Sequence, residues 1–192
     1  MGKNNIQLNF SDCIDGIDIS KSVFLGQGHS GKVYLMPDNR VIKIFKNEES
    51  CVRECIILNS VKGNKHFPSV YFCSGNYIIR EYVPGICLED YIKKFGLSQR
   101  LIINLIEMIL DFERLGFKRL DMRCAHIFVQ QDESVKVIDP RKHYTEDVAY
   151  PEKIIGKLKK LKVYNKFNNV LKNRYPDLYN QWNGKIRYKK AA

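Results

Sequence analysis

The 192-residue sequence has no long hydrophobic run. Its longest apolar region, LIINLIEMIL, spans ten residues and is interrupted by Asn104 and Glu107. A transmembrane helix needs about 20 mostly apolar residues, so we expect no membrane span. The first residues, MGKNNIQLNFSD, contain no apolar segment typical of a secretory signal, and Ile6 stands where N-myristoylation requires Ser or Thr. We therefore expect a cytoplasmic protein.

The six cysteines form no CxxC pair, and several of them lie within apolar segments. Unpaired cysteine often behaves as a small hydrophobic residue, and metal or redox motifs usually bring cysteines closer together in the sequence. We therefore expect reduced thiols, as is usual in the cytosol.

Acidic residues are scarce near the end of the chain. Residues 151–192 hold twelve Lys or Arg against two Asp or Glu, a net charge of +10, while the whole chain has a net charge of +11. Two interpretations of this basic tail stay open. Its charges are either the solvated face of a packed helix or a surface for an acidic protein, RNA or an anionic membrane.

The sequence also lacks repeats and Gly/Ser-rich or Pro-rich linkers, which favours a single domain over residues 1–192. Alternating apolar residues bounded by turn signals predict five strands in the first half. These predicted strands cover residues 22–28, 32–37, 39–46, 69–75 and 77–83. A helix is predicted over residues 48–61, with Glu in its first turn.

After residue 83 the pattern changes to a mainly helical one. Apolar spacing predicts helices over 87–95 and 97–117, then two short strands over 126–130 and 135–139. A further apolar stripe predicts one helix over 151–175 that stops before Pro176. The predicted fold class is α+β, with a five-stranded antiparallel lobe over 1–83 and a reduced helical lobe over 84–192.

The segment LGQGHSGKVYL places Gly26, Gly28 and Gly31 in the spacing GxGxxGxV, which ends at Val33. Dinucleotide-binding turns share this glycine spacing, but in those folds a helix follows the last glycine. Here the residues that follow predict two strands joined by a tight turn. The glycines are therefore expected in a hairpin whose backbone can lie close to phosphate groups.

Lys43 interrupts the apolar strand VIKIF between Ile42 and Ile44. Because side chains alternate along a strand, Lys43 points to the opposite face from both isoleucines. It is either an ordinary solvent-facing lysine or a cation for phosphate oxygens. Glu54, within the predicted helix, is a candidate charge partner.

Several motifs in fixed order resemble those of the protein kinase-like superfamily. They are GxGxxGxV, VIK in place of VAIK, RE in the following helix, RLDMRCAH in place of the catalytic loop and DPR in place of DFG. The resemblance covers about residues 20–145. It implies a two-lobed kinase-like fold, similar to compact RIO-type kinases and to small atypical bacterial serine/threonine kinase-like proteins.

The resemblance also implies an ATP site. Its residues would be Gly26, Gly28, Gly31, Val33, Lys43, Glu54, Glu81, Val83 and Phe128. The glycines would cover ATP, Lys43 would contact the α and β phosphates and pair with Glu54, and Val33 would lie over adenine. Glu81 and Val83 would offer backbone groups to adenine, and Arg80 would occupy the gatekeeper position.

The same resemblance assigns catalytic roles to Asp121, Arg123 and Lys43 and metal-binding roles to Asp139 and His126. Asp121 would receive or orient the acceptor hydroxyl, Arg123 would neutralise the γ phosphate, and Asp139 would hold Mg²⁺. His126 stands where the family has Asn. Imidazole suits Mn²⁺ better than Mg²⁺, and His126 could instead bond Asp121 or a phosphate, or cap the strand.

Other departures indicate how such a site would be regulated. Leu120 replaces the arginine that precedes the catalytic Asp, Pro140 follows the metal-binding Asp, and eleven residues separate Asp139 from Pro151. We expect a site that works without loop phosphorylation.

Three functions stay open. The first is an ATP-dependent phosphotransferase acting on Ser or Thr hydroxyls of a protein substrate, including its own. The second is a nucleotide-binding pseudokinase that serves as an interaction module. The third is a kinase for a small molecule, or one that works beside RNA.

Overall fold

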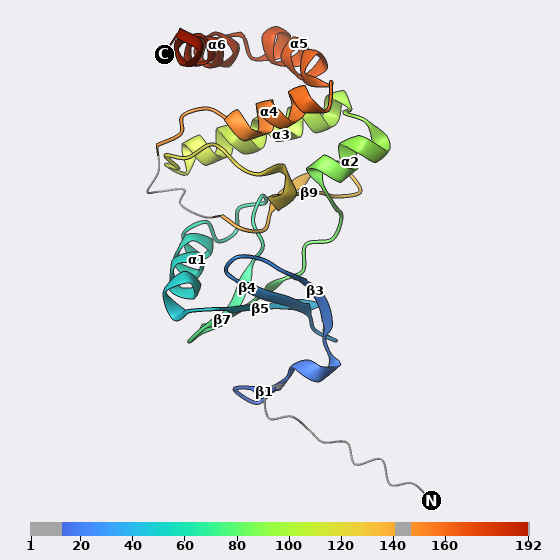
Figure 1. The fold of residues 1–192 in the computed structure, drawn as a ribbon, viewed down its shortest axis with the longest axis vertical. Coiled ribbons are helices and arrows are strands. Elements are labelled where there is room, and N and C mark those ends of the chain that lie inside the picture. The colour runs from blue at the N-terminus through green and yellow to red at the C-terminus, as the bar shows by residue number, and fades with distance from the viewer. Residues whose placement is uncertain (1–12, 141–146, 192) are drawn as a thin grey trace, which may run out of the picture. The chain divides into compact units, whose positions relative to one another are not determined.

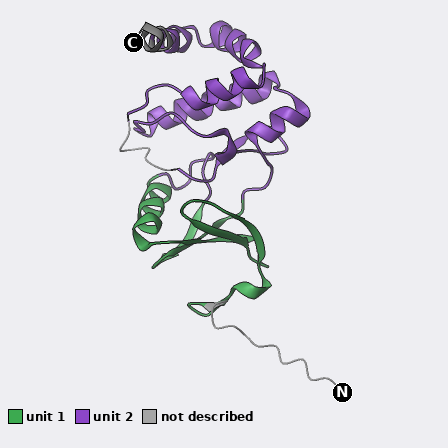
Figure 2. Ribbon diagram, viewed as in Figure 1, with its two compact units in different colours: residues 1–60, 69–82 green, residues 61–68, 83–192 purple. Residues whose placement is uncertain are grey.

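The computed structural model describes residues 13–140 and 147–191. Over these ranges the chain is a mixed α+β protein with a five-stranded antiparallel sheet and six α-helices (Figure 1). It divides into two compact units (Figure 2). Unit 1 comprises residues 1–60 and 69–82, and unit 2 comprises 61–68 and 83–192. The chain passes from unit 1 to unit 2 for the last time after residue 82, next to the boundary predicted after residue 83. The inclusion of residues 61–68 in unit 2 was not predicted.

The sheet of unit 1 has the order β3-β4-β5-β7-β6, and every neighbouring pair of strands is antiparallel. Its strands are β3 (Val23–Gln27), β4 (Gly31–Leu35), β5 (Arg40–Phe45), β6 (Val70–Ser74) and β7 (Tyr77–Glu81). The predicted five-stranded antiparallel sheet is thereby confirmed. Asn39 makes the tight turn between β4 and β5 with a φ of 62°, a left-handed conformation that Asn tolerates better than most residues.

Strand alternation gives the two faces of this sheet different partners. One face, around Ile42, packs against Ile14 of β1 (Cys13–Ile14) and Ile17 of β2 (Ile17–Asp18). The opposite face, around Ile78, packs against Cys51 of helix α1 (Glu48–Ser60). The helix therefore covers the same face of β5 from which Lys43 projects.

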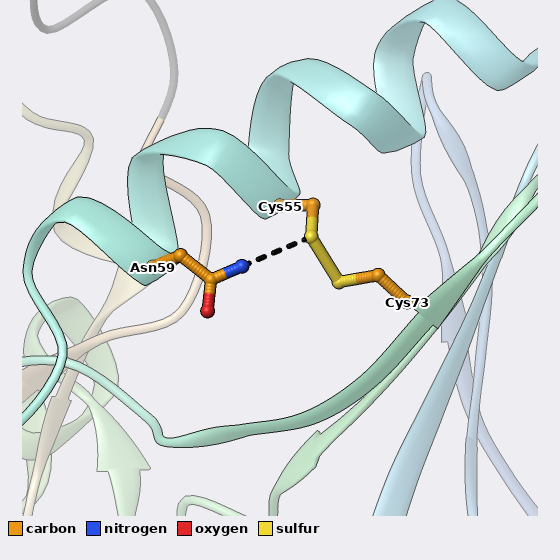
Figure 3. Close-up of a disulfide and its surroundings, with 3 residues drawn as sticks. All are labelled: Cys55, Asn59 and Cys73. Carbon is orange, nitrogen blue, oxygen red and sulfur yellow. Dashed lines mark hydrogen bonds between the residues drawn. A yellow bond between two sulfur atoms is a disulfide. The ribbon is translucent and has the colours of Figure 1, made fainter.

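Helix α1 is also joined to the sheet by a disulfide between Cys55 and Cys73 of β6 (Figure 3). The expectation that all cysteines are reduced is wrong for this pair. Their Cα atoms are 6.5 Å apart, within the range that a disulfide spans. The two residues meet because a helix packs on a strand, and this tertiary contact leaves no spacing motif in the sequence.

Unit 2 contains the other five helices and a small sheet of order β10-β9-β8. The helices are α2 (Leu88–Phe95), α3 (Gln99–Arg114), α4 (Glu152–Lys160), α5 (Tyr164–Arg174) and α6 (Pro176–Ala191). The strands are β8 (Ile86–Cys87), β9 (Ile127–Val129) and β10 (Val135–Val137). Ser98 caps α3 by accepting a hydrogen bond from Leu101 N–H.

The core of unit 2 is built on α3. Its fully buried side chains are Leu101, Ile102, Leu105, Ile106, Met108, Ile109 and Phe112. Segment 61–68 belongs to this core because Phe67 packs on the rings of Phe112 and Phe117 at 5.2 and 5.9 Å. His66 reinforces the attachment, since its Nδ1 lies 2.9 Å from the carbonyl oxygen of Val135.

The prediction of a single helix over 151–175 is wrong. The chain forms α4 and α5 instead, separated at Lys162, whose φ of 60° interrupts the helical backbone. A further helix, α6, begins at Pro176, where the fixed φ of proline suits the first helical position. In the described ranges, no helix combines the length and apolar character needed to cross a membrane.

Candidate functional site

The glycine-rich hairpin of unit 1 joins β3 to β4. Gly28 N–H donates to the Gly31 carbonyl at 2.9 Å and closes the turn. A Cβ on Gly31 would lie 1.8 Å from the Ile44 carbonyl oxygen, so only glycine fits there. Gly26 lies at an irregularity in the β3–β4 register and faces Val33 across the ladder.

Gly28 differs from Gly31. Its φ is not positive, and within the described part of the chain a Cβ on Gly28 would meet no heavy atom within 4 Å. The fold itself therefore does not require glycine at this position. The missing side chain leaves room for a ligand to approach the backbone N–H groups of the turn.

Lys43 lies in one row of the sheet with Val33 and Ile78. Its Nζ lies 2.5 Å from Oε2 of Glu54, which α1 supplies, and the two side chains are 6% and 2% exposed. The ammonium also lies 4.7 Å from the centre of the Phe45 ring. The solvent-facing interpretation of Lys43 is therefore wrong, because the packing of α1 buries this face.

The residues predicted to contact adenine lie around the end of β7. Arg80 is buried in the strand, and Glu81 N–H donates to the Ser69 carbonyl at 2.8 Å. Glu81 Oε2 accepts a second hydrogen bond from Ser69 N–H at 3.1 Å. Val83 is buried and is the first residue of unit 2 after the strand.

Unit 1 also contains a groove of about 630 Å³. Its lining includes Ile14, Lys32, Tyr34 and Ile44. Ile44 alternates with Lys43 along β5, so these side chains belong to the sheet face opposite the Lys43–Glu54 pair. The groove is therefore not formed around that pair.

In unit 2 a short parallel bridge brings Asp121 to the beginning of α4. Leu120 N–H donates to the Val148 carbonyl at 2.9 Å, and Val148 N–H donates to the Lys118 carbonyl at 3.0 Å. This pairing carries the first turn of α4 to the carboxylate of Asp121.

Basic donors hold that carboxylate, which is 4% exposed. Oδ1 accepts a hydrogen bond from Lys153 N–H at 2.6 Å, and Oδ2 lies 3.0 Å from Lys153 Nζ. The Arg119 guanidinium lies 3.8 Å from Oδ2. Asp121 therefore caps α4, whose own N-cap residue, Pro151, has no side-chain acceptor.

Sequence reasoning missed the roles of Arg119 and Lys153 around Asp121. The sequence did contain one signal that α4 takes its N-terminal cap from another part of the chain. A helix that begins after proline, with no Ser, Thr, Asp or Asn at its N-cap, needs an acceptor from elsewhere in the fold. That signal does not reveal which of the acidic residues supplies the acceptor.

The β9–β10 hairpin brings together the two predicted metal ligands. Ile138 N–H donates to the His126 carbonyl at 3.0 Å, and His126 Nδ1 lies 3.7 Å from Asp139 Oδ2. In residues 13–140 and 147–191, no three His, Cys, Asp or Glu side chains gather around one point as ligands. One oxygen and one nitrogen still fit a divalent ion that takes its remaining ligands from phosphates and water.

The remaining predicted residues lie near this hairpin. Arg123 is exposed and precedes the 3-10 turn Cys124–His126. Phe128, in β9, faces Cys87 and Lys136 across the small sheet. Burial raises the pKa of the Cys124 thiol to about 12, so Cys124 is protonated at neutral pH and is a poor metal ligand.

No family model matches the chain, and neither does any curated protein.

Proposed function

We propose that the chain is an ATP-dependent phosphotransferase of the protein kinase-like type, transferring the γ phosphate to a Ser or Thr hydroxyl. The observation that carries the proposal is the buried Lys43–Glu54 pair beside the glycine hairpin. Removing two charges from water costs several kcal/mol per ion. A buried lysine held by a carboxylate, next to a glycine-rich turn, is an arrangement expected of a phosphate-binding element.

Most of the nucleotide-binding residues in this proposal belong to unit 1. The turn around Gly26 and Gly28 approaches the phosphates, and Lys43 contacts their oxygens while Glu54 fixes its orientation. Val33, beside Lys43 in the same row of the sheet, supports the adenine. The backbone groups of Glu81 and Val83 are assigned to the adenine edge.

Unit 2 supplies the catalytic residues. Asp121 orients the acceptor hydroxyl and takes its proton, and Arg123 offers an exposed guanidinium to the γ phosphate. Asp139 and His126 would hold Mg²⁺ or Mn²⁺. When bound, such an ion neutralises negative charge on the phosphates.

The proposal is tested by incubating the protein with γ-labelled ATP, Mg²⁺ or Mn²⁺, and protein acceptors including the chain itself. We expect label on Ser or Thr, and we expect Lys43→Met to reduce transfer by at least about 100-fold. Lys46→Met is the matched control, because Lys46 is an exposed residue just after β5. Absence of transfer by the wild type with every acceptor overturns the proposal.

A nucleotide-binding pseudokinase is favoured by one observation. The Asp121 carboxylate already accepts a short hydrogen bond from α4, as a purely structural cap would. In that case ATP would raise the melting temperature, Lys43→Met would abolish the rise, and no label would be transferred.

An RNA-associated activity is favoured by the basic helices of unit 2. The exposed lysines of α4, α5 and the turn between them are Lys153, Lys159, Lys160, Lys162, Lys166 and Lys172. If these lysines contact phosphates, RNA binding should weaken steeply with salt. Neutralising all of them except Lys153 should then abolish RNA binding, and unchanged binding would leave these charges as an ordinary solvated face.

A further inference from the structure

Lys153 contacts both oxygens of one carboxylate with two different groups. Its backbone N–H donates to Oδ1 of Asp121 and its ammonium lies 3.0 Å from Oδ2. The contact joins positions 32 residues apart in the sequence. One residue of α4 thus fixes both the position and the rotation of the Asp121 side chain.

The other lysines of α4 have different surroundings. Lys157 forms an ion pair with Glu89 at 2.7 Å, and Lys159 lies over the ring of Tyr164. Lys160 is exposed. The contact with Asp121 is therefore specific to Lys153 and does not follow from the general basicity of the helix.

The Asp121 carboxylate is nearly inaccessible to water, so its charge needs nearby compensation. The positive end of the α4 dipole, the Lys153 ammonium and the Arg119 guanidinium supply it. An ionised carboxylate has about four acceptor sites. The two contacts with Lys153 do not use all of these sites, so the carboxylate can still accept a hydrogen bond from an acceptor hydroxyl.

We infer that Lys153 is a positioning residue for phosphoryl transfer, holding the Asp121 carboxylate oriented toward the acceptor hydroxyl. This inference rests on the proposed function. In the transfer step the hydroxyl oxygen forms a bond to the γ phosphorus, and the bond from that phosphorus to the β,γ-bridging oxygen breaks. The hydroxyl proton passes to Asp121, ADP leaves, and the Lys153 ammonium keeps its protons.

The test compares Lys153→Met with Lys153→Arg in the full chain. The methionine variant keeps the backbone N–H and removes the cation, whereas the arginine variant keeps a cation. We expect Lys153→Met to lower kcat by roughly 10- to 100-fold with KM for ATP changed less than about threefold. Lys153→Arg should recover most of the loss, and Lys160→Met should match the wild type.

Equal kcat values for Lys153→Met and Lys160→Met would overturn the inference, as would equal losses in the methionine and arginine variants. Melting temperatures separate a folding defect from a catalytic one, and Lys153→Gln provides a second neutral variant if the first is unstable. The proposed function fails separately, if the wild type transfers no label or if Asp121→Asn transfers it normally. If the wild type transfers label and Asp121→Asn does not, a Lys153→Met variant with the kcat of the wild type excludes only the role of Lys153.

Discussion

The two units attach a helix near their candidate residues in different ways. In unit 1, α1 is joined to the sheet by adjacent residues, Glu54 through an ion pair with Lys43 and Cys55 through a disulfide with Cys73. In unit 2, α4 meets Asp121 through its N-terminal turn and one partly exposed lysine. Glu54 is thus held by a buried pair and a neighbouring covalent bond, whereas Asp121 depends on hydrogen bonds to a helix end.

This difference predicts different consequences of mutation. Changes at the α1 contacts should strongly affect stability, because a buried charge pair or a covalent bond is lost. Changes at the α4 contact should affect stability less, because the helix has other buried contacts through Ile154, Ile155 and Leu158.

The largest expected effect is that of Glu54→Ala. It leaves the Lys43 ammonium buried without this carboxylate, which should lower the free energy of unfolding by about 3–5 kcal/mol. Urea denaturation measures the loss. The control is Glu49→Ala on the same helix, whose ion pair with Arg53 is exposed and should contribute less than about 0.5 kcal/mol. Similar losses for the two variants would contradict the assignment of a buried charge pair.

Cys73→Ser should have the next largest effect. The disulfide closes a segment with a sequence separation of 18, and loops of this size contribute about 3 kcal/mol by restricting the unfolded chain. Reducing agent should lower the stability of the wild type to that of the variant. Cys87→Ser, at a free cysteine, should retain the response to reducing agent. Insensitivity of the wild type to reducing agent would contradict the predicted contribution.

Asp121→Ala should destabilise less, by about 0.5–2 kcal/mol, because it removes a helix cap. Asn can accept the same hydrogen bond from Lys153 N–H, so Asp121→Asn should retain most of the wild-type stability. Thermal unfolding of the two variants distinguishes them. If the two variants are equally destabilised, the hydrogen bond that caps α4 contributes little to stability, and the loss of stability comes from removing the negative charge.

The smallest effect concerns pH and His66 in unit 2. Burial lowers the pKa of His66 below its ordinary value of 6.5 and outweighs the Asp111 carboxylate 3.4 Å from Nε2. The unfolded chain therefore binds a proton at higher pH than the folded chain. Stability should be retained above pH 6.5 and fall as the pH is lowered through 6.5 toward the lower folded pKa. His66→Gln should flatten this part of the curve, and an unchanged slope would exclude His66 as its source.

Much of unit 1 could be predicted from the sequence, since strand alternation and turn residues are local signals. They identified the five strands, and the motif order paired Lys43 with Glu54. The Cys55–Cys73 bond could not be predicted, because it depends on how α1 lies across β6. In unit 2, α2, α3, β9 and β10 were predicted in their order, whereas β8 and α6 were not. The division of 151–175 depends on one left-handed residue, Lys162, with no Gly or Pro to mark it.

The residues around Asp121 show the same limit. The motif assigned a role to the aspartate, but Lys153 reaches it only through the pairing of 118–120 with Val148. Sequence spacing carries no information on that pairing.

The most direct measurement is γ-label transfer by Asp121→Asn beside its melting temperature. Phosphotransferase chemistry predicts a variant that melts close to the wild type, because the cap on α4 is kept, yet transfers label at least about 100-fold more slowly. A variant with both wild-type stability and wild-type transfer would contradict the account and leave Asp121 as a helix cap alone.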